Sequence, residues 1–262
     1  MIKKVVTIGD HIQLALSDFR PEVDKFTFPL FAIDNRDRPD LYSSSVAIDI
    51  NGTIVLVTAA HAIFEISKTG TVPHIGTHKI FPLPGTFARS SEAGTDPLDI
   101  AAMVLSTEFV SNAKIEAIPL NRTALGKSFD HAQMRCIYGY PCSKNRTSQQ
   151  ADEVNYIYTK YGLAYAGVTA ESQCDYLSFT KDQAKHIALY YQKKSKNEMG
   201  ENVIPPNPKG MSGGGYWIVP NTFAAKNFYL GGISIEFHQK RSLVFATRID
   251  QVMSFIYGHL LN

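Results

Sequence analysis

The sequence lacks a long apolar run. No window approaches the ~20 apolar residues that a helix needs to cross a bilayer. Near the N-terminus, Asp10, His11 and Gln13 interrupt the only stretch that resembles a signal peptide. We therefore expect a soluble, cytoplasmic protein that has no membrane partner.

Cysteine is scarce, and its spacing is uninformative. The chain has three cysteines, Cys136, Cys142 and Cys174, with no Cys-x-x-Cys spacing. An odd number of cysteines argues against a disulfide framework, and the missing spacing argues against a zinc knuckle. A reducing compartment fits this cysteine usage.

An excess of charge of one sign is also missing. The 26 Lys and Arg residues against 24 Asp and Glu residues give a net charge of +2, and the basic residues are scattered. Because phosphate recognition needs a basic stripe, we do not expect nucleic acid as a partner. The content of 44% hydrophobic and 11% aromatic residues excludes a disordered chain.

Short strand-like runs, separated by Gly and Pro, dominate the rest of the sequence. Val46–Ile50 and Thr53–Val57 flank Asn51-Gly52, and Asn-Gly between two such runs is the strongest short-range signal for a hairpin. Further strand-like runs are Ile100–Leu105, Cys136–Tyr140, Tyr161–Val168, His186–Tyr191, Tyr229–Glu236 and Ser242–Thr247.

Only one segment is clearly helical, and it lies at the C-terminus. Ile249, Val252, Met253, Ile256 and Leu260 follow helical spacing and form one apolar face. A second, short helical turn is expected after Ala59, and the polar residues 121–135 are expected to link two halves. The pattern predicts an all-β protein built from two barrels and closed by a terminal helix.

Three segments contain residues suited to catalysis. The segments are Val57–Ala62, Asp96–Leu105 and Pro208–Gly215. His61 lies just after a strand, Asp99 lies at the start of an apolar strand, and Ser212 lies in a glycine-dense loop. Taken singly, they have structural explanations: a strand-flanking histidine, a capping carboxylate and a tight turn. Together they supply a base, an orienting carboxylate and a nucleophile.

The chemistry of acyl transfer explains why these residue types are needed. A serine hydroxyl is a weak nucleophile until a neighbouring imidazole accepts its proton. A buried carboxylate holds that imidazole in one tautomer. Backbone N–H groups in a glycine-rich loop can then stabilise the tetrahedral oxyanion without obstruction by side chains.

Three motifs resemble the catalytic motifs of the trypsin/chymotrypsin-like serine peptidases. They are Thr58-Ala59-Ala60-His61, Asp99-Ile100-Ala101 and Gly210-Met211-Ser212-Gly213-Gly214, supported by Gly139-Tyr140-Pro141 and Gly231-Gly232-Ile233-Ser234. The resemblance extends from about residue 25 to residue 262. It implies two antiparallel six-stranded β-barrels with the active site between them. Residues 1–125 would form the N-terminal barrel with His61 and Asp99, and residues 126–262 would form the C-terminal barrel with Ser212 and the terminal helix.

The resemblance also implies a role for each site residue. Ser212 would be the nucleophile, His61 the general base and acid, and Asp99 the residue that orients His61. The backbone N–H groups of Gly210 and Ser212 would form the oxyanion hole. The implied activity is a serine endopeptidase that acts on a protein or peptide substrate through an acyl-enzyme, with no metal or organic cofactor.

Two positions depart from the extracellular members of this family. Met211 occupies the position of the aspartate that pairs with a new N-terminus after zymogen cleavage, so we expect no such activation switch. The pattern is closer to that of intracellular and bacterial members such as the high-temperature-requirement type, without the appended PDZ domain.

Pro206, at the expected base of the primary specificity pocket, offers no carboxylate and favours a small or apolar substrate residue. Glu236 or His238 would either line the pocket wall or be a solvated strand residue.

Other nucleophile and metal sites are conceivable in the sequence. Gly210–Gly214 also fits the nucleophile elbow of α/β-hydrolases, with Asp250 and His259 completing the triad. However, that fold needs βαβ units that the hairpin-like pattern does not provide. His74 and His78 have H-x3-H spacing, but Pro73 and Gly76 argue against the helix that a metal site of this kind would require. Cys142 could serve as a nucleophile, but no base lies near it in the sequence, so a structural thiol is the better interpretation.

A non-enzymatic function is the main alternative. A peptidase-like fold that is catalytically silent would act as a peptide-binding or scaffolding module. The long polar segment Lys193–Pro208 lies directly upstream of the nucleophile loop. We interpret it as a lid that an activating protein partner, or the substrate, must order before the oxyanion hole forms.

Overall fold

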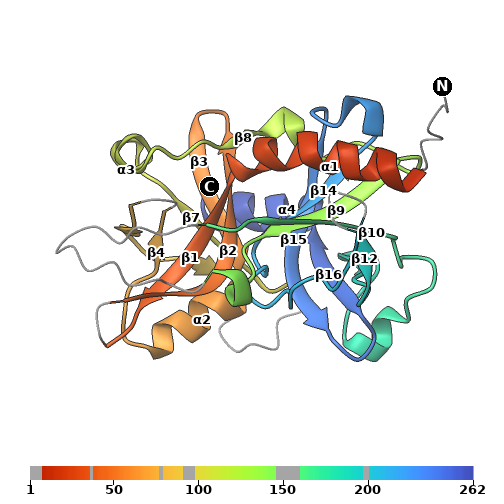
Figure 1. Cartoon of the computed structure of the whole chain (residues 1–262). Coiled ribbons are helices and arrows are strands. Elements are labelled where there is room, and N and C mark those ends of the chain that lie inside the picture. Colours follow the sequence, from red (N-terminus) through yellow and green to blue (C-terminus); the bar gives the residue numbers. More distant parts are fainter. Residues whose placement is uncertain are drawn as a thin grey trace, which may run out of the picture.

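The computed structural model describes residues 8–35, 38–76, 79–90, 98–145, 160–196 and 201–261. In these residues, the chain forms two curled, mainly antiparallel β-sheets and one small two-stranded sheet (Figure 1). One helix lies near each end of the described chain. The fold class predicted from the sequence is therefore confirmed.

The first sheet contains eight strands rather than the expected six. Its order is β5-β4-β1-β2-β3-β7-β6, and β8 pairs in parallel with β2. The strands are β1 (Thr27–Ile33), β2 (Pro39–Ile50), β3 (Thr53–Ala59), β4 (His74–Ile75), β5 (Phe81–Pro82), β6 (Ala88–Arg89), β7 (Ile100–Val104) and β8 (Ile118–Pro119). The hairpin turn is at Asn51-Gly52 as predicted, and both residues have positive φ, 54° and 91°.

The second sheet has six strands in the order β10-β9-β14-β15-β16-β11. They are β9 (Met134–Gly139), β10 (Leu163–Gly167), β11 (His186–Tyr190), β14 (Gly215–Val219), β15 (Tyr229–His238) and β16 (Leu243–Arg248). An isolated bridge between Thr169 and Leu189 joins the chain after β10 to β11. The small sheet is the hairpin of β12 (Ser195–Lys196) and β13 (Asn202–Val203).

Short helical segments connect the strands. They are α2 (Ala60–Lys68), α3 (Thr107–Ala113), η1 (Leu120–Arg122), η2 (Cys142–Lys144), η3 (Tyr176–Phe179) and η4 (Thr222–Ala224). The predicted C-terminal helix is present as α4 (Ile249–His259), and the predicted turn after Ala59 is the start of α2.

The prediction of a single clear helix is wrong, because residues Ile8–Asp24 form the long helix α1. Its residues Ala15, Leu16, Phe19 and Val23 are buried. The Phe19 ring makes edge contacts with two rings associated with the second sheet, 6.1 Å from Trp217 and 5.3 Å from Phe228 between centroids. The N-terminal helix therefore packs on the second sheet although it precedes the first sheet in the sequence.

The C-terminal end of α1 is fixed by a buried polar cluster around Asp24. Its carboxylate accepts hydrogen bonds from the hydroxyls of Tyr138 (2.5 Å) and Tyr140 (2.8 Å), and it pairs with Lys160 at 2.7 Å. Burial alone would raise the pKa of Asp24, but the hydrogen bonds from Lys160 and Tyr138 outweigh burial and lower it. Asp24 is therefore ionised at neutral pH and ties α1 to β9.

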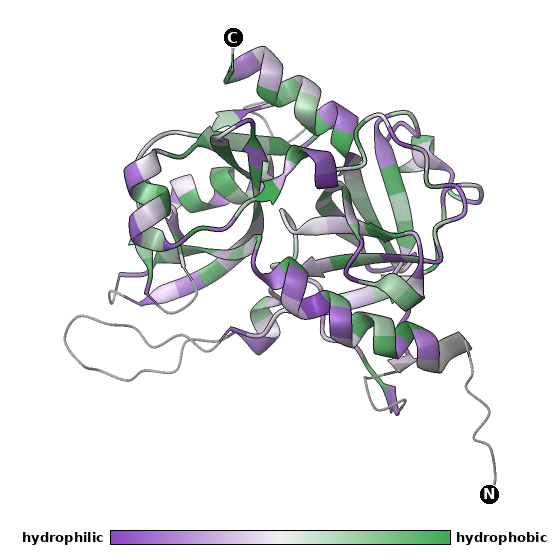
Figure 2. Ribbon diagram, turned by 90° about the horizontal axis from the view of Figure 1, so that it is seen from above, coloured by the Kyte–Doolittle hydropathy of each residue, from purple (hydrophilic) through white to green (hydrophobic). Residues whose placement is uncertain are grey.

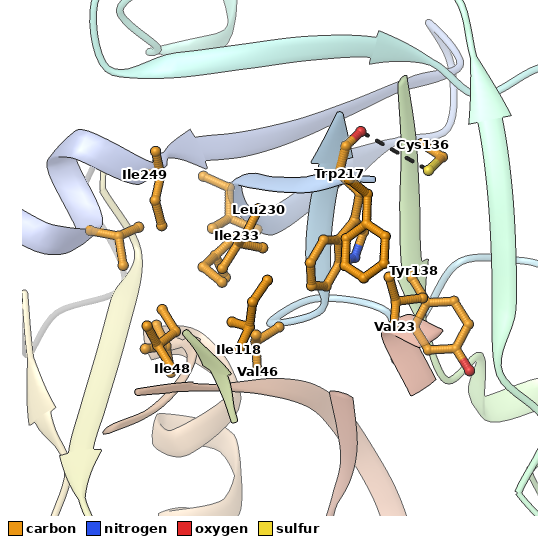
Figure 3. Close-up of a cluster of buried hydrophobic side chains, with 14 of the residues drawn as sticks. Val23, Val46, Ile48, Ile118, Cys136, Tyr138, Trp217, Leu230, Ile233 and Ile249 are labelled. Carbon is orange, nitrogen blue, oxygen red and sulfur yellow. Dashed lines mark hydrogen bonds between the residues drawn. The ribbon is translucent and has the colours of Figure 1, made fainter. Parts of the chain in front are cut away.

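One hydrophobic core joins the two sheets. Figure 3 shows side chains from β2 facing side chains from β14 and β15, with α1 and α4 contributing at the edges. The labelled members include Val46 and Ile48 from the first sheet and Trp217, Leu230 and Ile233 from the second. Figure 2, coloured by hydropathy, shows apolar residues along the strands of both sheets. Buried residues from both sheets belong to this one cluster.

The proposed division of the chain near residue 125 stays a prediction. The long strands of the first sheet precede it and those of the second sheet follow it. Helix α1 belongs to the first part by sequence but contacts the second sheet. No helix in the described part of the chain is both long and apolar enough to span a membrane.

Candidate active site

His61 and Asp99 are brought together by two neighbouring strands. In the β3–β7 ladder, Ala59 at the end of β3 pairs with Ile100 at the start of β7. Asp99 directly precedes β7, and His61 follows Ala59 by two residues, in the first turn of α2. The ladder therefore places both residues side by side, where β3 ends and β7 begins.

The Asp99 carboxylate holds both the ring and the backbone of His61. Asp99 Oδ2 lies 2.6 Å from His61 Nδ1, and Oδ1 accepts the His61 backbone N–H at 2.8 Å. The backbone carbonyl of Asp99 accepts the N–H of Ala60 at 3.0 Å. Because an ionised carboxylate only accepts hydrogen bonds, Nδ1 carries the proton and Nε2 is left as an acceptor. Asp99 has a positive φ of 51°, a conformation held by these bonds.

The surroundings of His61 change the pKa of its imidazole. Partial burial lowers its pKa, but the hydrogen bond and charge of Asp99, with smaller contributions from Glu236 and Glu65, outweigh burial. The net effect is a His61 pKa above its ordinary value. The imidazole remains 43% exposed, whereas the Asp99 side chain is 17% exposed. The ring is therefore accessible while its partner is shielded.

Ser212 lies in a tight loop that the first sheet holds in place. Gly210 and Gly213 have φ values of 95° and 80°, which residues with side chains rarely adopt. The Ser212 carbonyl accepts hydrogen bonds from the Ser44 backbone N–H at 2.8 Å and from the Ser43 hydroxyl. The Ser44 hydroxyl donates to the Gly210 carbonyl at 2.8 Å. Strand β2 thus anchors the loop on both sides of Met211.

Close packing also explains why this loop needs glycine. A Cβ on Gly213 would lie 2.0 Å from the Ser44 carbonyl oxygen and 3.1 Å from the backbone nitrogen of Ala59. A Cβ on Gly210 would lie 2.6 Å from Cys142 Sγ. Residues 210–213 consequently lie directly against the segment that leads to His61.

The backbone N–H groups of the loop divide into used and unused donors. Met211 N–H donates to the Pro208 carbonyl at 2.8 Å, and Gly213 N–H donates to the Ser234 carbonyl at 2.6 Å. In the described part of the chain, the N–H groups of Gly210 and Ser212 donate to no protein group. These two donors are the ones that an oxyanion hole in this loop would use.

The Ser212 hydroxyl is not hydrogen-bonded to His61 in this structure. It donates to the backbone carbonyl of Ile235 at 3.3 Å. Among the described residues no hydrogen bond joins Ser212 to His61. Proton transfer between them therefore requires the Ser212 side chain to rotate, and catalytic hydrogen bonds commonly tighten only when substrate binds.

Sequence reasoning gave too little weight to Glu236. Its carboxylate pairs with Lys181 at 3.0 Å and lies 2.7 Å from Nε2 of His238, and its charge helps to raise the pKa of His61. It follows Ile235, whose carbonyl accepts the Ser212 hydroxyl. Its place beside an apolar strand end was the only signal in the sequence. At Pro206, the backbone carbonyl accepts the Tyr191 hydroxyl at 2.6 Å.

The alternative sites are not assembled. Asp250 and His259 both lie on α4 of a mostly β fold, and the His259 ring packs against Phe255, so the α/β-hydrolase arrangement is excluded. His74 Nδ1 contacts the Val72 carbonyl, and His78 lies outside the described residues. Within the described ranges no group of three or more residues is placed to hold a metal.

Cys142 is a partly buried thiol with a raised pKa rather than a reactive one. Its Sγ donates to the Leu41 carbonyl at 3.1 Å, and burial raises its pKa. All three cysteines are free.

No family model and no curated protein matches the chain. Among solved structures, the chain is similar to GrC, a granzyme, with a TM-score of 0.54 at 14% identity, over 92% of this chain and 96% of that one. HL collagenase is similar with a TM-score of 0.51 at 14% identity, over 92% and 95%. The chain has the chymotrypsin-like fold. The serine protease domain of the Sesbania mosaic virus polyprotein is also similar, with a TM-score of 0.44 at 14% identity, over 89% and 92%. All three are chymotrypsin-like serine proteases.

Proposed function

We propose that this protein is a serine endopeptidase that hydrolyses peptide bonds through Ser212, His61 and Asp99. One observation carries the proposal. A carboxylate-oriented histidine lies beside a glycine loop that holds a serine and two unused backbone N–H donors. Three chemical roles of acyl transfer are thereby supplied by groups on two facing sheets.

The first half of the reaction forms the acyl-enzyme. The Ser212 hydroxyl turns from the Ile235 carbonyl toward His61 Nε2, which takes its proton as Oγ attacks the substrate carbonyl carbon. Asp99 accepts the hydrogen bond from Nδ1–H, so the proton stays on Nδ1 and the imidazolium is stabilised. The N–H groups of Gly210 and Ser212 donate to the oxyanion, and each such donor lowers the barrier by about 3 kcal/mol. His61 then gives its proton to the leaving nitrogen as the C–N bond breaks.

The second half releases the acid product. His61 Nε2 accepts a proton from water as the water oxygen attacks the ester carbon. The bond to Ser212 Oγ breaks, and Oγ recovers the proton from His61. The side chains and backbone donors account for every proton, so the proposal requires no metal or organic cofactor.

The substrate preference and the setting are further parts of the proposal. Pro206 gives no carboxylate at the expected base of the specificity pocket, which supports a small or apolar residue before the scissile bond. An activating partner that orders residues 193–208 stays a prediction, since residues 197–200 lie outside the described residues. A cytoplasmic location also stays a prediction, supported by the free cysteines.

Labelling with a fluorophosphonate probe tests the proposal. We expect wild type and His259→Ala to be labelled, and Ser212→Ala and His61→Ala to remain unlabelled at matched folding by circular dichroism. His259 is the matched control because it lies on α4 outside the site. If folded wild type is not labelled, the catalytic proposal is wrong. The catalytically silent peptide-binding module then becomes the better interpretation.

A further inference from the structure

A groove of about 850 Å³ lies between α1, the edge of β10 and residues 202–206. Pro206, which is the expected base of the primary specificity pocket, is one of its lining residues. Helix α1 lies next to β9 and β10 of the second sheet (Figure 1). Leu16 and Leu163 lie in its apolar lining. Ile204, on the opposite border, is 83% exposed although it is a large apolar residue. None of the proposed catalytic residues lines this groove.

The groove is bordered by the backbone edge of a strand. Strand β10 is the last strand of its sheet, and within the described residues its ladder partner is β9 alone. Six successive residues, Tyr161–Ala166, line the groove. Four of them, Leu163–Ala166, belong to β10. Because successive side chains of a strand point to opposite faces, contact with all four means that the main chain borders the space. The N–H and carbonyl of Tyr161 are bonded to the Asn145 side chain, so the open edge is that of β10 itself. An edge strand presents alternate N–H and C=O groups that can pair with another extended chain.

Among the described residues, the charged side chains that line the groove are of one sign. These residues include Arg20, Lys144 and Lys194, and no described lining residue is Asp or Glu. Lys144 and Lys194 are exposed, and within the described part of the chain they form no ion pair. The Arg20 guanidinium lies over the Tyr161 ring at 5.5 Å from its centroid. This local excess of positive charge contrasts with a net charge of +2 for the whole chain.

We propose that this groove binds an extended acidic peptide of a partner protein, which adds as a strand to the free edge of β10. Carboxylates on alternate residues would face the lysines, while the residues between them would pack on Leu16 and Leu163. Single-stranded nucleic acid fits less well, because base stacking needs open aromatic faces. The ring centroids of Tyr165 and Tyr191 lie 4.2 Å apart, and the Arg20 guanidinium covers one face of the Tyr161 ring. The inference does not rest on peptidase activity.

Direct binding to the Ser212→Ala protein tests this proposal, because loss of the serine hydroxyl prevents cleavage of the probe. The probe is a fluorescein-labelled peptide of about ten residues, ~33 Å when extended, with Glu and Val alternating. We expect saturable binding by fluorescence polarisation that weakens as salt is raised. A peptide with Lys in place of Glu should not bind. No binding of the acidic peptide at low salt would overturn the proposal.

Charge reversal locates the site. We expect Lys144→Glu with Lys194→Glu to weaken binding about tenfold, whereas Lys79→Glu with Lys240→Glu, an equal charge change outside the groove, should leave it within about twofold. Equal loss in both double variants would mean general attraction to the protein surface and would contradict a groove site. Binding of an oligothymidylate with the same affinity and the same dependence on Lys144 and Lys194 would replace the peptide by a nucleic acid.

N-methylation of the peptide tests strand addition itself. Two peptides are compared, each methylated at alternate amides along one edge. We expect one to lose binding at least about tenfold and the other to keep it, since only one edge of an added strand faces β10. Equal binding of both methylated peptides would show that the main chain is not recognised.

Discussion

The two halves of the candidate site are built in different ways. His61 and Asp99 lie at the ends of two strands that pair directly, and the bonds that orient them lie within the first sheet. The Ser212 loop precedes β14 of the second sheet, but its carbonyl groups are held by Ser43 and Ser44 of the first sheet. The first half therefore depends on one sheet, and the second half depends on how two sheets dock.

The residues of the first sheet that contact the Ser212 loop share an unusual property. Ser43, Ser44 and Thr58 are fully buried hydroxyl residues. We call their contact with residues 210–213 the sheet interface. The Thr58 hydroxyl donates to the Ser44 carbonyl at 2.7 Å, and the Ser44 hydroxyl both donates to Gly210 and accepts the Tyr140 N–H at 2.8 Å. Buried hydroxyls with partners specify one arrangement, because any other docking leaves them unpaired.

Asp99→Asn is the strongest test of the first half. If the amide oxygen keeps the bond from the His61 backbone N–H, the amide NH2 faces Nδ1 and favours the tautomer with its proton on Nε2. We therefore expect kcat to fall about 10⁴-fold while the melting temperature changes little. Hydrolysis of a fluorogenic peptide and thermal unfolding measure the two effects. Asp49→Asn is the control, since Asp49 accepts a backbone N–H at the hairpin turn at 2.7 Å and should leave kcat unchanged. Asp99→Asn activity within tenfold of wild type would contradict the role of Asp99.

Gly213→Ala is the strongest test of the second half. The new Cβ would lie 2.0 Å from the Ser44 carbonyl oxygen, so the loop must move, and a displacement of ~1 Å costs about 10²-fold in activity. Gly52→Ala is the matched control, because Gly52 also has positive φ but has no atom within 4 Å of its Cβ position. Both variants carry the strain of about 1 kcal/mol from positive φ. Equal activity of the two variants would show that the sheet interface does not set the geometry of the loop.

A comparison of Ser44→Ala with Ser45→Ala distinguishes a hydroxyl that bonds across the sheet interface from one that bonds within the first sheet. Both hydroxyls are buried on β2, but Ser44 bonds across the sheet interface, whereas Ser45 donates to Phe28 within the first sheet at 3.1 Å. We expect each variant to lose about 1–3 kcal/mol of unfolding free energy. Only Ser44→Ala should also lose activity, about tenfold. Urea unfolding and peptide hydrolysis provide the two readouts, and an equal loss of activity in both variants would remove the distinction.

The features predictable from sequence are the local ones. The Asn51-Gly52 hairpin, the strand that begins at Ile100 and the helix that begins at Ile249 each have a signal within a few residues, and each is present. Helix α1 was missed although Ala15, Phe19 and Val23 follow helical spacing. The polar residues Asp10, His11 and Gln13 interrupt the apolar run at the start of this segment and obscure its helical pattern.

The non-local features of the site had no such signal. Nothing adjacent to Ser43 and Ser44 indicates that their partners are Gly210 and Ser212, because the pairing exists only once the sheets dock. The motif around Ser212 predicted a glycine loop but not what holds it. In the same way, Glu236 has its effect through space, since Lys181 and His61 are distant from it in sequence.

The smallest expected effect is electrostatic. A carboxylate of the second sheet changes the pKa of a histidine that the first sheet holds. Glu236 on β15 helps to raise the pKa of His61, together with Asp99 and Glu65, while Lys181 and His238 pair with its carboxylate. Glu236→Gln removes a negative charge and leaves Lys181 unpaired, and both changes disfavour imidazolium. We therefore expect the His61 pKa to fall and the acid limb of kcat/KM to move to lower pH, with the alkaline plateau unchanged. Glu65→Gln should move the limb in the same direction by less, because Glu65 contributes least to the shift. An unchanged or higher limb in Glu236→Gln would show that the charge of β15 does not reach His61 across the sheet interface.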